Sequence, residues 1–115
     1  MKLLFDSHLD LAWNAISWKR DITLPLREMN AREAQLDDHV ARGRATVSLP
    51  EMRRGRVAVC LGTVLARTPH GTTPAIFPGT LDFPSQEIAY AAAQGQRAYY
   101  RVLESEGEIT DAADR

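Results

Sequence analysis

Two stretches of the chain have the hydrophobic pattern of β-strands. Residues 2–10 begin with the apolar run Leu3, Leu4 and Phe5 and then place polar side chains at alternate positions, which predicts a strand. Residues 57–65 are an almost continuous run of β-branched and other apolar residues, which is typical of a strand buried on both faces of a parallel sheet. We therefore expect two strands, joined by a long connection.

The clearest helical pattern lies between residues 85 and 107. One stripe of a 3.6-residue period is apolar there, and it consists of Ile88, Ala91, Ala92, Tyr99, Val102 and Leu103. Ser85 is a typical N-cap residue at the start of this segment, and Gly107 is a typical stop at its end. The sequence therefore predicts one long amphipathic helix after the second strand.

Shorter helical segments are predicted in the connection between the two strands. Residues 11–18 are densely apolar and fit a short buried turn or helix, and residues 28–36 fit a second short helix. A further helical turn is expected between Ser48, as N-cap, and Gly55, because a proline stands early and a glycine late. The order of strand, connection, strand, loop and long helix predicts an α/β fold with a parallel sheet.

Composition and charge narrow the class of protein. The chain has 115 residues, of which 44% are hydrophobic and 25% charged, with a formal net charge of −1. These values are ordinary for a globular domain and give no bulk attraction to nucleic acid or to an anionic membrane. The apolar start of the chain is too short for a signal peptide, and no run approaches the length of a membrane span. We expect a cytoplasmic protein with no nucleic-acid or membrane partner, in which Cys60 is a core residue without a disulfide.

The end of the first predicted strand carries the candidate chemistry. Asp6, His8 and Asp10 occupy every second position, so they share one face if the strand persists that far. Imidazole and carboxylate groups suit Zn²⁺, although a catalytic zinc normally takes about three protein ligands. The spacing alone leaves a second interpretation open, in which His8 and Asp10 hydrogen-bond to each other or cap the segment that follows.

Three stretches in order along nearly the whole chain resemble landmarks of the membrane dipeptidase (renal dipeptidase) family. "FDSHLDLAW" is similar to the motif that closes the family's first strand, and "TVSLPEMRRGRVAVCLGT" is similar to the lead into its second strand. "EIAYAAAQGQRAYYRVLE" resembles the following helix in bacterial members. Together these landmarks are more specific than the His-x-Asp spacing, and they favour the metal interpretation.

The resemblance implies a (β/α)₈ TIM barrel of the metal-dependent hydrolase type, in which two zinc ions activate a water molecule that hydrolyses a dipeptide. His8 and Asp10 would ligate one zinc, Trp13 would line the substrate pocket unless it only packs in the core, and Asp6 would orient the turn. Such a barrel needs about 250 residues, so residues 1–115 would be the N-terminal part of a single truncated domain. The bridging carboxylate and the two further histidines belong to later strands, so no catalytic residue is expected within this chain.

Two other interpretations remain open. The chain could be a catalytically incomplete fragment or remnant that acts at most as an assembly module. Two strands of the buried type would then expose edges and apolar faces, which favours homo-oligomers or aggregation. A different metal hydrolase on the same barrel is less well supported, because such enzymes more often carry His-x-His at this strand.

Overall fold

The computed structural model describes residues 1–69, 71 and 79–114, which form a small α/β fold. Its elements, in chain order, are β1 (Leu4–Leu9), α1 (Leu11–Ser17), α2 (Leu26–Glu33), α3 (Leu49–Arg54), β2 (Val57–Gly62), α4 (Gln86–Ser105) and a 3₁₀ turn at Ala112–Asp114. Within the described residues, no helix is long and apolar enough to cross a membrane.

The two strands pair in parallel, as predicted. Phe5 lies opposite Val59, and Leu9 lies opposite Gly62 at the carboxyl end of the pair. The register is irregular along the way, but the backbone N–H of Thr63 donates to the carbonyl of Leu9 at 3.0 Å, so the two strands end side by side. No third strand joins them among the described residues, which therefore show a two-stranded parallel sheet and not a barrel.

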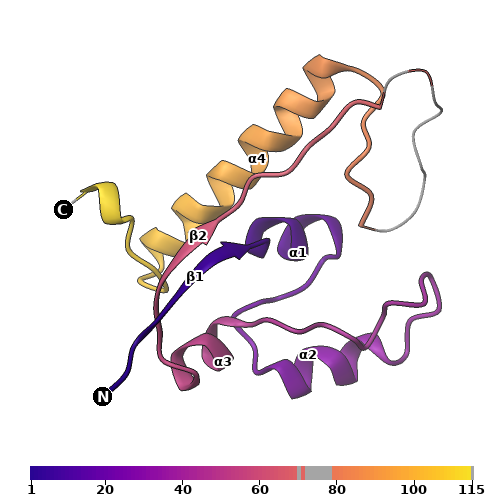
Figure 1. Cartoon of the computed structure of the whole chain (residues 1–115). Coiled ribbons are helices and arrows are strands. Elements are labelled where there is room, and N and C mark those ends of the chain that lie inside the picture. Colours follow the sequence, from indigo (N-terminus) through magenta and orange to yellow (C-terminus); the bar gives the residue numbers. More distant parts are fainter. Residues whose placement is uncertain (70, 72–78, 115) are drawn as a thin grey trace.

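The core of the molecule lies between the helices rather than around the strands. Figure 1 shows α4 running beside β2, with α2 and α3 on the other side of the strand pair. Helix α1 packs against α4, and α3 packs against β2. The buried cluster that joins these elements consists of Leu11, Ile22, Met29, Ala45, Leu49 and Leu103. Leu9 and Cys60 from the strands pack against the edge of this cluster, half-buried.

The predicted ends of the long helix are confirmed, but its predicted buried stripe is only partly right. The Ser85 hydroxyl accepts a hydrogen bond from the N–H of Ile88, and Gly107 takes a φ of 74° just after the helix. Leu103 is buried, whereas the Ile88 and Val102 side chains remain exposed. The buried polar residue Gln96 was not predicted, and its amide oxygen accepts from the N–H of Leu65 at 2.8 Å. Gln96 therefore links α4 by hydrogen bonding to the backbone at Leu65, in the segment that follows β2.

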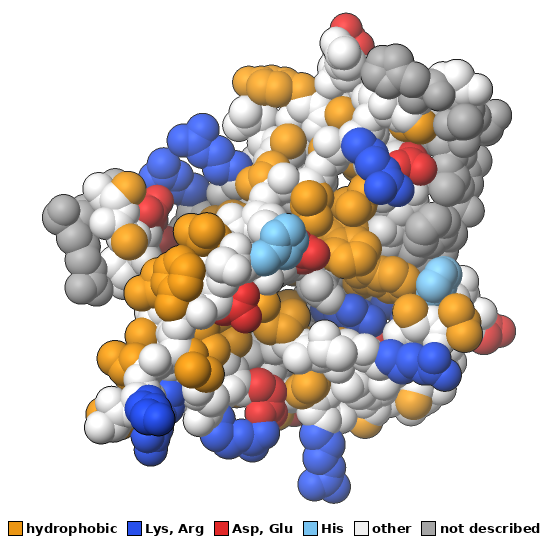
Figure 2. All heavy atoms as spheres, viewed as in Figure 1, with side chains coloured by type: hydrophobic (Ala, Val, Ile, Leu, Met, Phe, Trp, Pro, Cys, Tyr) orange, Lys and Arg blue, Asp and Glu red, His pale blue; other side chains and the backbone are white. Residues whose placement is uncertain are grey.

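The prediction that β2 is buried on both faces is wrong for the structure described. Val59 and Leu61 are 46% and 55% exposed, and Leu4 and Phe5 of β1 are 55% and 62% exposed. The reason is geometric, because two strands and the helices beside them cannot cover both faces of the pair. Figure 2 shows hydrophobic side chains gathered at several places on one face of the molecule.

The predicted helical turn before β2 is confirmed as α3, with Ser48 at the N-cap and Gly55 at the C-cap. The expected capping by the Ser48 side chain is wrong, however. Its hydroxyl is buried and has no hydrogen-bond partner within the described part of the chain. The N–H of Leu49 donates instead to the carbonyl of Ile22 at 2.8 Å, so the start of this helix is fixed by a distant segment.

A buried cluster of charges holds the connection between the strands in place. The Glu33 side chain, 6% exposed, accepts from Arg20 Nε at 2.6 Å and from Arg42 Nη1 at 3.1 Å, and also from the N–H of Gly43 at 2.9 Å. Both guanidinium groups also lie over the ring of Trp18, at 5.0 and 5.2 Å from its centroid. Cation–π contacts of this kind add to the ion pairs when the groups are desolvated.

Burial alone would raise the pKa of the Glu33 carboxyl. Hydrogen bonds from Arg20, Gly43 and Arg42, together with the charge of Arg20, outweigh this effect and hold the pKa below its ordinary value of 4.5. The carboxyl therefore stays ionised in the folded chain at neutral pH. Its interactions stabilise the fold above the pKa of the unfolded state, and this contribution is lost as the pH falls through the lowered pKa of the folded state.

We predict that Glu33→Gln lowers the free energy of unfolding by about 3 kcal/mol, because it leaves two buried guanidinium groups without their carboxylate. Urea denaturation at neutral pH measures this loss. The variant should also lose less stability than the wild-type chain between pH 5 and pH 3, since one carboxyl with a lowered pKa has been removed.

Glu28→Gln is the matched control for this prediction. Glu28 accepts from Arg32 at 2.6 Å, but the two side chains are 48% and 64% exposed. An exposed pair of this kind contributes roughly 0.3 kcal/mol. Equal losses of stability in the two variants would show that the buried cluster does not hold the fold together.

Candidate functional site

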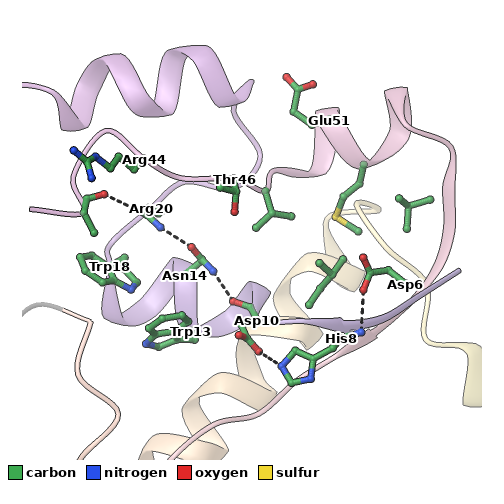
Figure 3. A pocket seen from close by; sticks show the side chains of 15 residues that line it. Asp6, His8, Asp10, Trp13, Asn14, Trp18, Arg20, Arg44, Thr46 and Glu51 are labelled. Carbon is green, nitrogen blue, oxygen red and sulfur yellow. Dashed lines mark hydrogen bonds and ion pairs between the residues drawn. The ribbon is translucent and has the colours of Figure 1, made fainter. Parts of the chain in front are cut away.

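A cavity of about 550 Å³ lies beside β1 and the start of α1. The residues that line it include Asp6, His8, Asp10, Trp13, Arg20 and Arg44. All three residues of the alternating polar pattern therefore border one cavity. Figure 3 shows them along one end of it, with Arg20 and Arg44 toward the other end.

Asp6 shapes the backbone next to the candidate ligands. Its Oδ1 accepts a hydrogen bond from the backbone N–H of His8 at 2.9 Å. This bond fixes the local backbone and leaves the imidazole of His8 available for other partners. The geometry agrees with the expectation that Asp6 orients the turn and does not itself bind the metal.

His8 and Asp10 lie against each other where β1 ends. Nε2 of His8 is 2.9 Å from Oδ1 of Asp10, and the two side chains are 64% and 26% exposed. Asp10 occupies the N-cap position of α1, yet its side chain makes no capping hydrogen bond within the described residues. Of the two non-metal interpretations, the close approach of the two side chains is present and the capping role is wrong.

Nε2 of His8 and Oδ1 of Asp10 are atoms of the kinds that bind zinc. The distance between them is close to the distance between two ligand atoms of one zinc ion. Two ligand atoms at 2.1 Å from a tetrahedral zinc lie roughly 3.4 Å apart. The pair would have to open by about half an ångström to admit the ion, and the exposed imidazole has room to turn. Among residues 1–69, 71 and 79–114, however, no group of three His, Cys, Asp or Glu side chains lies close enough to hold a metal. The described residues thus offer two side chains of suitable ligand type and no third.

Asp10 is held from two further directions that the sequence did not reveal. The hydroxyl of Thr63 donates to Oδ1 of Asp10 at 2.5 Å, and the side-chain amide of Asn14 donates to the Asp10 carbonyl at 2.9 Å. Thr63 follows β2 directly, and the parallel pairing seen in the structure places it beside the end of β1. Asn14 lies four residues after Asp10, which places it one turn along α1.

Trp13 lies in the wall of the cavity, as the resemblance implied, and it also packs against other groups. Its Nε1 donates to the carbonyl of Gly79 at 2.8 Å. Its ring meets that of Trp18 edge to face, with centroids 6.1 Å apart. Both proposed roles, pocket wall and packing, are therefore compatible with its position, and contact with a substrate stays a prediction.

The cavity is connected to the buried charge cluster through Asn14. Nη1 of Arg20 donates to Oδ1 of Asn14 at 2.7 Å, while the other nitrogens of Arg20 bind Glu33. Figure 3 shows this series of contacts from Arg20 through Asn14 to Asp10. Hydrogen bonds through Asn14 therefore link the charge cluster to the backbone of Asp10, a candidate metal ligand.

Two other side chains of ligand or nucleophile type, His39 and Cys60, do not line this cavity. His39 packs edge to face on Trp18, with centroids 5.0 Å apart, and does not line the cavity. His70 lies outside the described residues. Burial, and to a smaller extent the charge of Asp6, raises the pKa of the Cys60 thiol. A protonated thiol is a poor nucleophile, so Cys60 fits its expected role as a packing residue.

Comparison with models of known protein families, with curated proteins and with solved structures found no match to this chain. Membership of the membrane dipeptidase family therefore stays a prediction from the three sequence stretches.

We predict that Gly79→Ala lowers the free energy of unfolding by about 3 kcal/mol. Gly79 has a φ of 82°, and a Cβ there would lie 2.1 Å from Cε2 of Trp18. The variant must therefore adopt a strained backbone and also displace an indole ring that borders the cavity. Thermal or urea denaturation followed by tryptophan fluorescence measures both effects.

Gly107→Ala separates the two causes. Gly107 has a similar φ of 74°, but no atom lies within 4 Å of a Cβ built on it. This control should lose only about 1 kcal/mol, the cost of the backbone conformation, and should keep the wild-type fluorescence. A Gly79→Ala chain no less stable than the Gly107→Ala chain would contradict the packing of Trp18 on Gly79.

Proposed function

We propose that this chain forms the first two β/α units of a zinc-dependent dipeptidase barrel, in which His8 and Asp10 ligate one of two zinc ions. The observation that carries the proposal is the 2.9 Å approach of His8 Nε2 to Asp10 Oδ1, at the carboxyl end of a parallel strand and beside a cavity. In β/α barrels the active site lies at this end of the strands. The motif resemblance and the geometry thus point to the same residues.

The chemistry of the two side chains supports a hydrolase. Neutral imidazole and carboxylate are ligands that zinc prefers. Zinc, when bound, supplies a Lewis acid that activates water and polarises the scissile carbonyl of a dipeptide. In this proposal Trp13 contacts the substrate from the cavity wall, and Asp6 keeps His8 in place through the backbone.

The exposed strands support the barrel. Leu4, Phe5, Val59 and Leu61 are large apolar residues, and each is between 46% and 62% exposed. Isolated apolar side chains on a surface are normal, but a strand pair with apolar residues on both faces is typical of a sheet that further elements cover. Additional parallel strands and their helices would cover these residues in a complete barrel.

A second candidate function has its own supporting observation. The described residues provide two metal ligands and no group of three, which is insufficient for a catalytic zinc site. The chain would then be a catalytically incomplete module, and its exposed strands would mediate assembly with another copy. In this case the close pair of His8 and Asp10 is all that remains of the metal motif.

Sequencing of the transcript beyond the codon for Arg115 distinguishes the two candidates. A reading frame that continues into a strand with a glutamate, and later into two strands that end in histidine, would support the dipeptidase. A stop codon at this point would support the incomplete module and would overturn the enzyme proposal for this chain.

We predict that the 115-residue chain binds Zn²⁺ weakly and releases no amino acids from dipeptides. His8→Ala and Asp10→Asn should each weaken binding at least about tenfold, because each removes one of two ligands and an amide is a poorer zinc ligand than a carboxylate. Isothermal titration calorimetry with ZnCl₂ measures the affinity, and an amino-acid release assay measures turnover.

His39→Ala is the control, since this histidine lies outside the cavity and should leave zinc binding unchanged. Equal binding by the wild-type, His8→Ala and Asp10→Asn chains would remove both residues from the proposed site. Zinc-dependent dipeptide hydrolysis that His8→Ala abolishes would instead show that two ligands suffice.

A further inference from the structure

Thr63 occupies a special position relative to Asp10. It is the first residue after β2, and its backbone N–H donates to the carbonyl of Leu9 at 3.0 Å. Its hydroxyl lies 2.5 Å from Oδ1 of Asp10 and 3.4 Å from the carbonyl oxygen of Leu9. A hydroxyl has one proton to donate, and the shorter bond to a charged acceptor is the stronger one. The Thr63 hydroxyl therefore donates to Asp10.

The long helix holds Thr63 from the opposite side. The hydroxyl of Tyr100 donates to the carbonyl of Thr63 at 2.8 Å and accepts from the N–H of Ala12 at 3.3 Å. The Tyr100 ring also packs on Gly62, where a Cβ would lie 2.9 Å from the ring carbon Cε1. One side chain thus joins the residue after β2 to the first turn of α1. Because Asp10 lies between these two segments, the position of the Thr63 hydroxyl relative to it is fixed by tertiary structure.

The contact with Thr63 differs in one respect from the contact with His8. Nε2 of His8 lies 2.9 Å from the same Oδ1. A nitrogen that binds a cation has no proton to donate, so His8 can give Asp10 no hydrogen bond from Nε2 once this atom becomes a zinc ligand. The Thr63 hydroxyl can keep its bond, because a carboxylate oxygen has more than one acceptor site. Among the side chains described, Thr63 is then the group that still holds the Asp10 carboxylate.

We infer that Thr63 is a positioning residue, which fixes the orientation of the Asp10 carboxylate before and after a metal ion binds. This inference deepens the proposed function and, as far as metal affinity is concerned, rests on it. Hydrogen-bonded partners of metal ligands commonly change metal affinity by 10- to 100-fold when they are removed. The hydroxyl of Thr63 is such a partner, supplied by the strand next to the one that carries the ligands.

The test compares Thr63→Val with Thr63→Ser in the full 115-residue chain. Valine keeps the β-branched shape and loses the hydroxyl, whereas serine keeps the hydroxyl. NMR couplings between Hα and the two Hβ protons of Asp10 report its χ1 rotamer without any metal. Competition with a chromophoric chelator reports the affinity for Zn²⁺. Wild-type and Thr63→Ser chains should show one Asp10 rotamer, and Thr63→Val should show averaged couplings and about tenfold weaker zinc binding.

Thr23→Val is the matched control. The Thr23 hydroxyl donates to Oδ1 of Asp21 at 2.6 Å, so this variant removes a bond of the same kind from another part of the chain. It should leave the Asp10 couplings and the zinc affinity unchanged.

The outcomes separate this inference from the proposed function. Unchanged Asp10 couplings in Thr63→Val, or averaged couplings already in the wild-type chain, would overturn the inference whatever the metal affinity. Couplings that depend on the Thr63 hydroxyl in a chain that binds no zinc would support the inference and count against the proposed function. An unfolded Thr63→Val chain is recognised from its amide spectrum, and Tyr100→Phe then takes its place, with loosened Asp10 couplings expected because Thr63 loses its support.

Discussion

The parallel pairing of β1 with β2 determines how Thr63 lies relative to Asp10 in the candidate site. Parallel strands end at the same edge of their sheet, so the residue after β2 meets the residue after β1. The bond from the N–H of Thr63 to the carbonyl of Leu9 sets this register at the carboxyl end. A shift by one residue would turn the Thr63 hydroxyl away from Asp10. The geometry of the His8 and Asp10 pair thus depends on contacts between residues more than 50 positions apart in the sequence.

The charge cluster in the connection supports the same site from another direction. Arg20 is bound by Glu33 and also donates to Asn14, whose amide donates to the carbonyl of Asp10. A buried carboxylate between two guanidinium groups contributes little net stability compared with apolar packing. Through Asn14, its partner Arg20 nevertheless links the connection to the first turn of α1 and to the backbone of Asp10.

The sequence predicted features that depend on local physics and missed those that depend on tertiary contacts. The ends of α4 at Ser85 and Gly107 follow from capping preferences. Strand alternation accounts for Asp6 and His8 but not for Asp10, because β1 ends at Leu9 and Asp10 is the N-cap of α1. The hydrogen bond from Thr63 to Asp10 requires the register of the strand pair, which no local pattern contains. Burial was the least predictable property, because exposure at Val59 depends on which other elements cover the strands.

The buried charged side chains and the apolar side chains of the strands differ in how completely the described residues supply their contacts. The buried charges of Arg20, Glu33 and Arg42 find partners within the chain, and the bonds from the two guanidinium groups to Glu33 measure 2.6 to 3.1 Å. The strands do not, since Phe5 and Leu61 remain more than half exposed while Leu11 and Leu103 are almost completely buried. A β/α unit has this asymmetry, because its helices and loops complete their own contacts whereas each strand needs neighbours on both edges. The candidate metal ligands lie at the carboxyl end of the strand pair, which is where the proposed barrel would bring additional ligands from further strands.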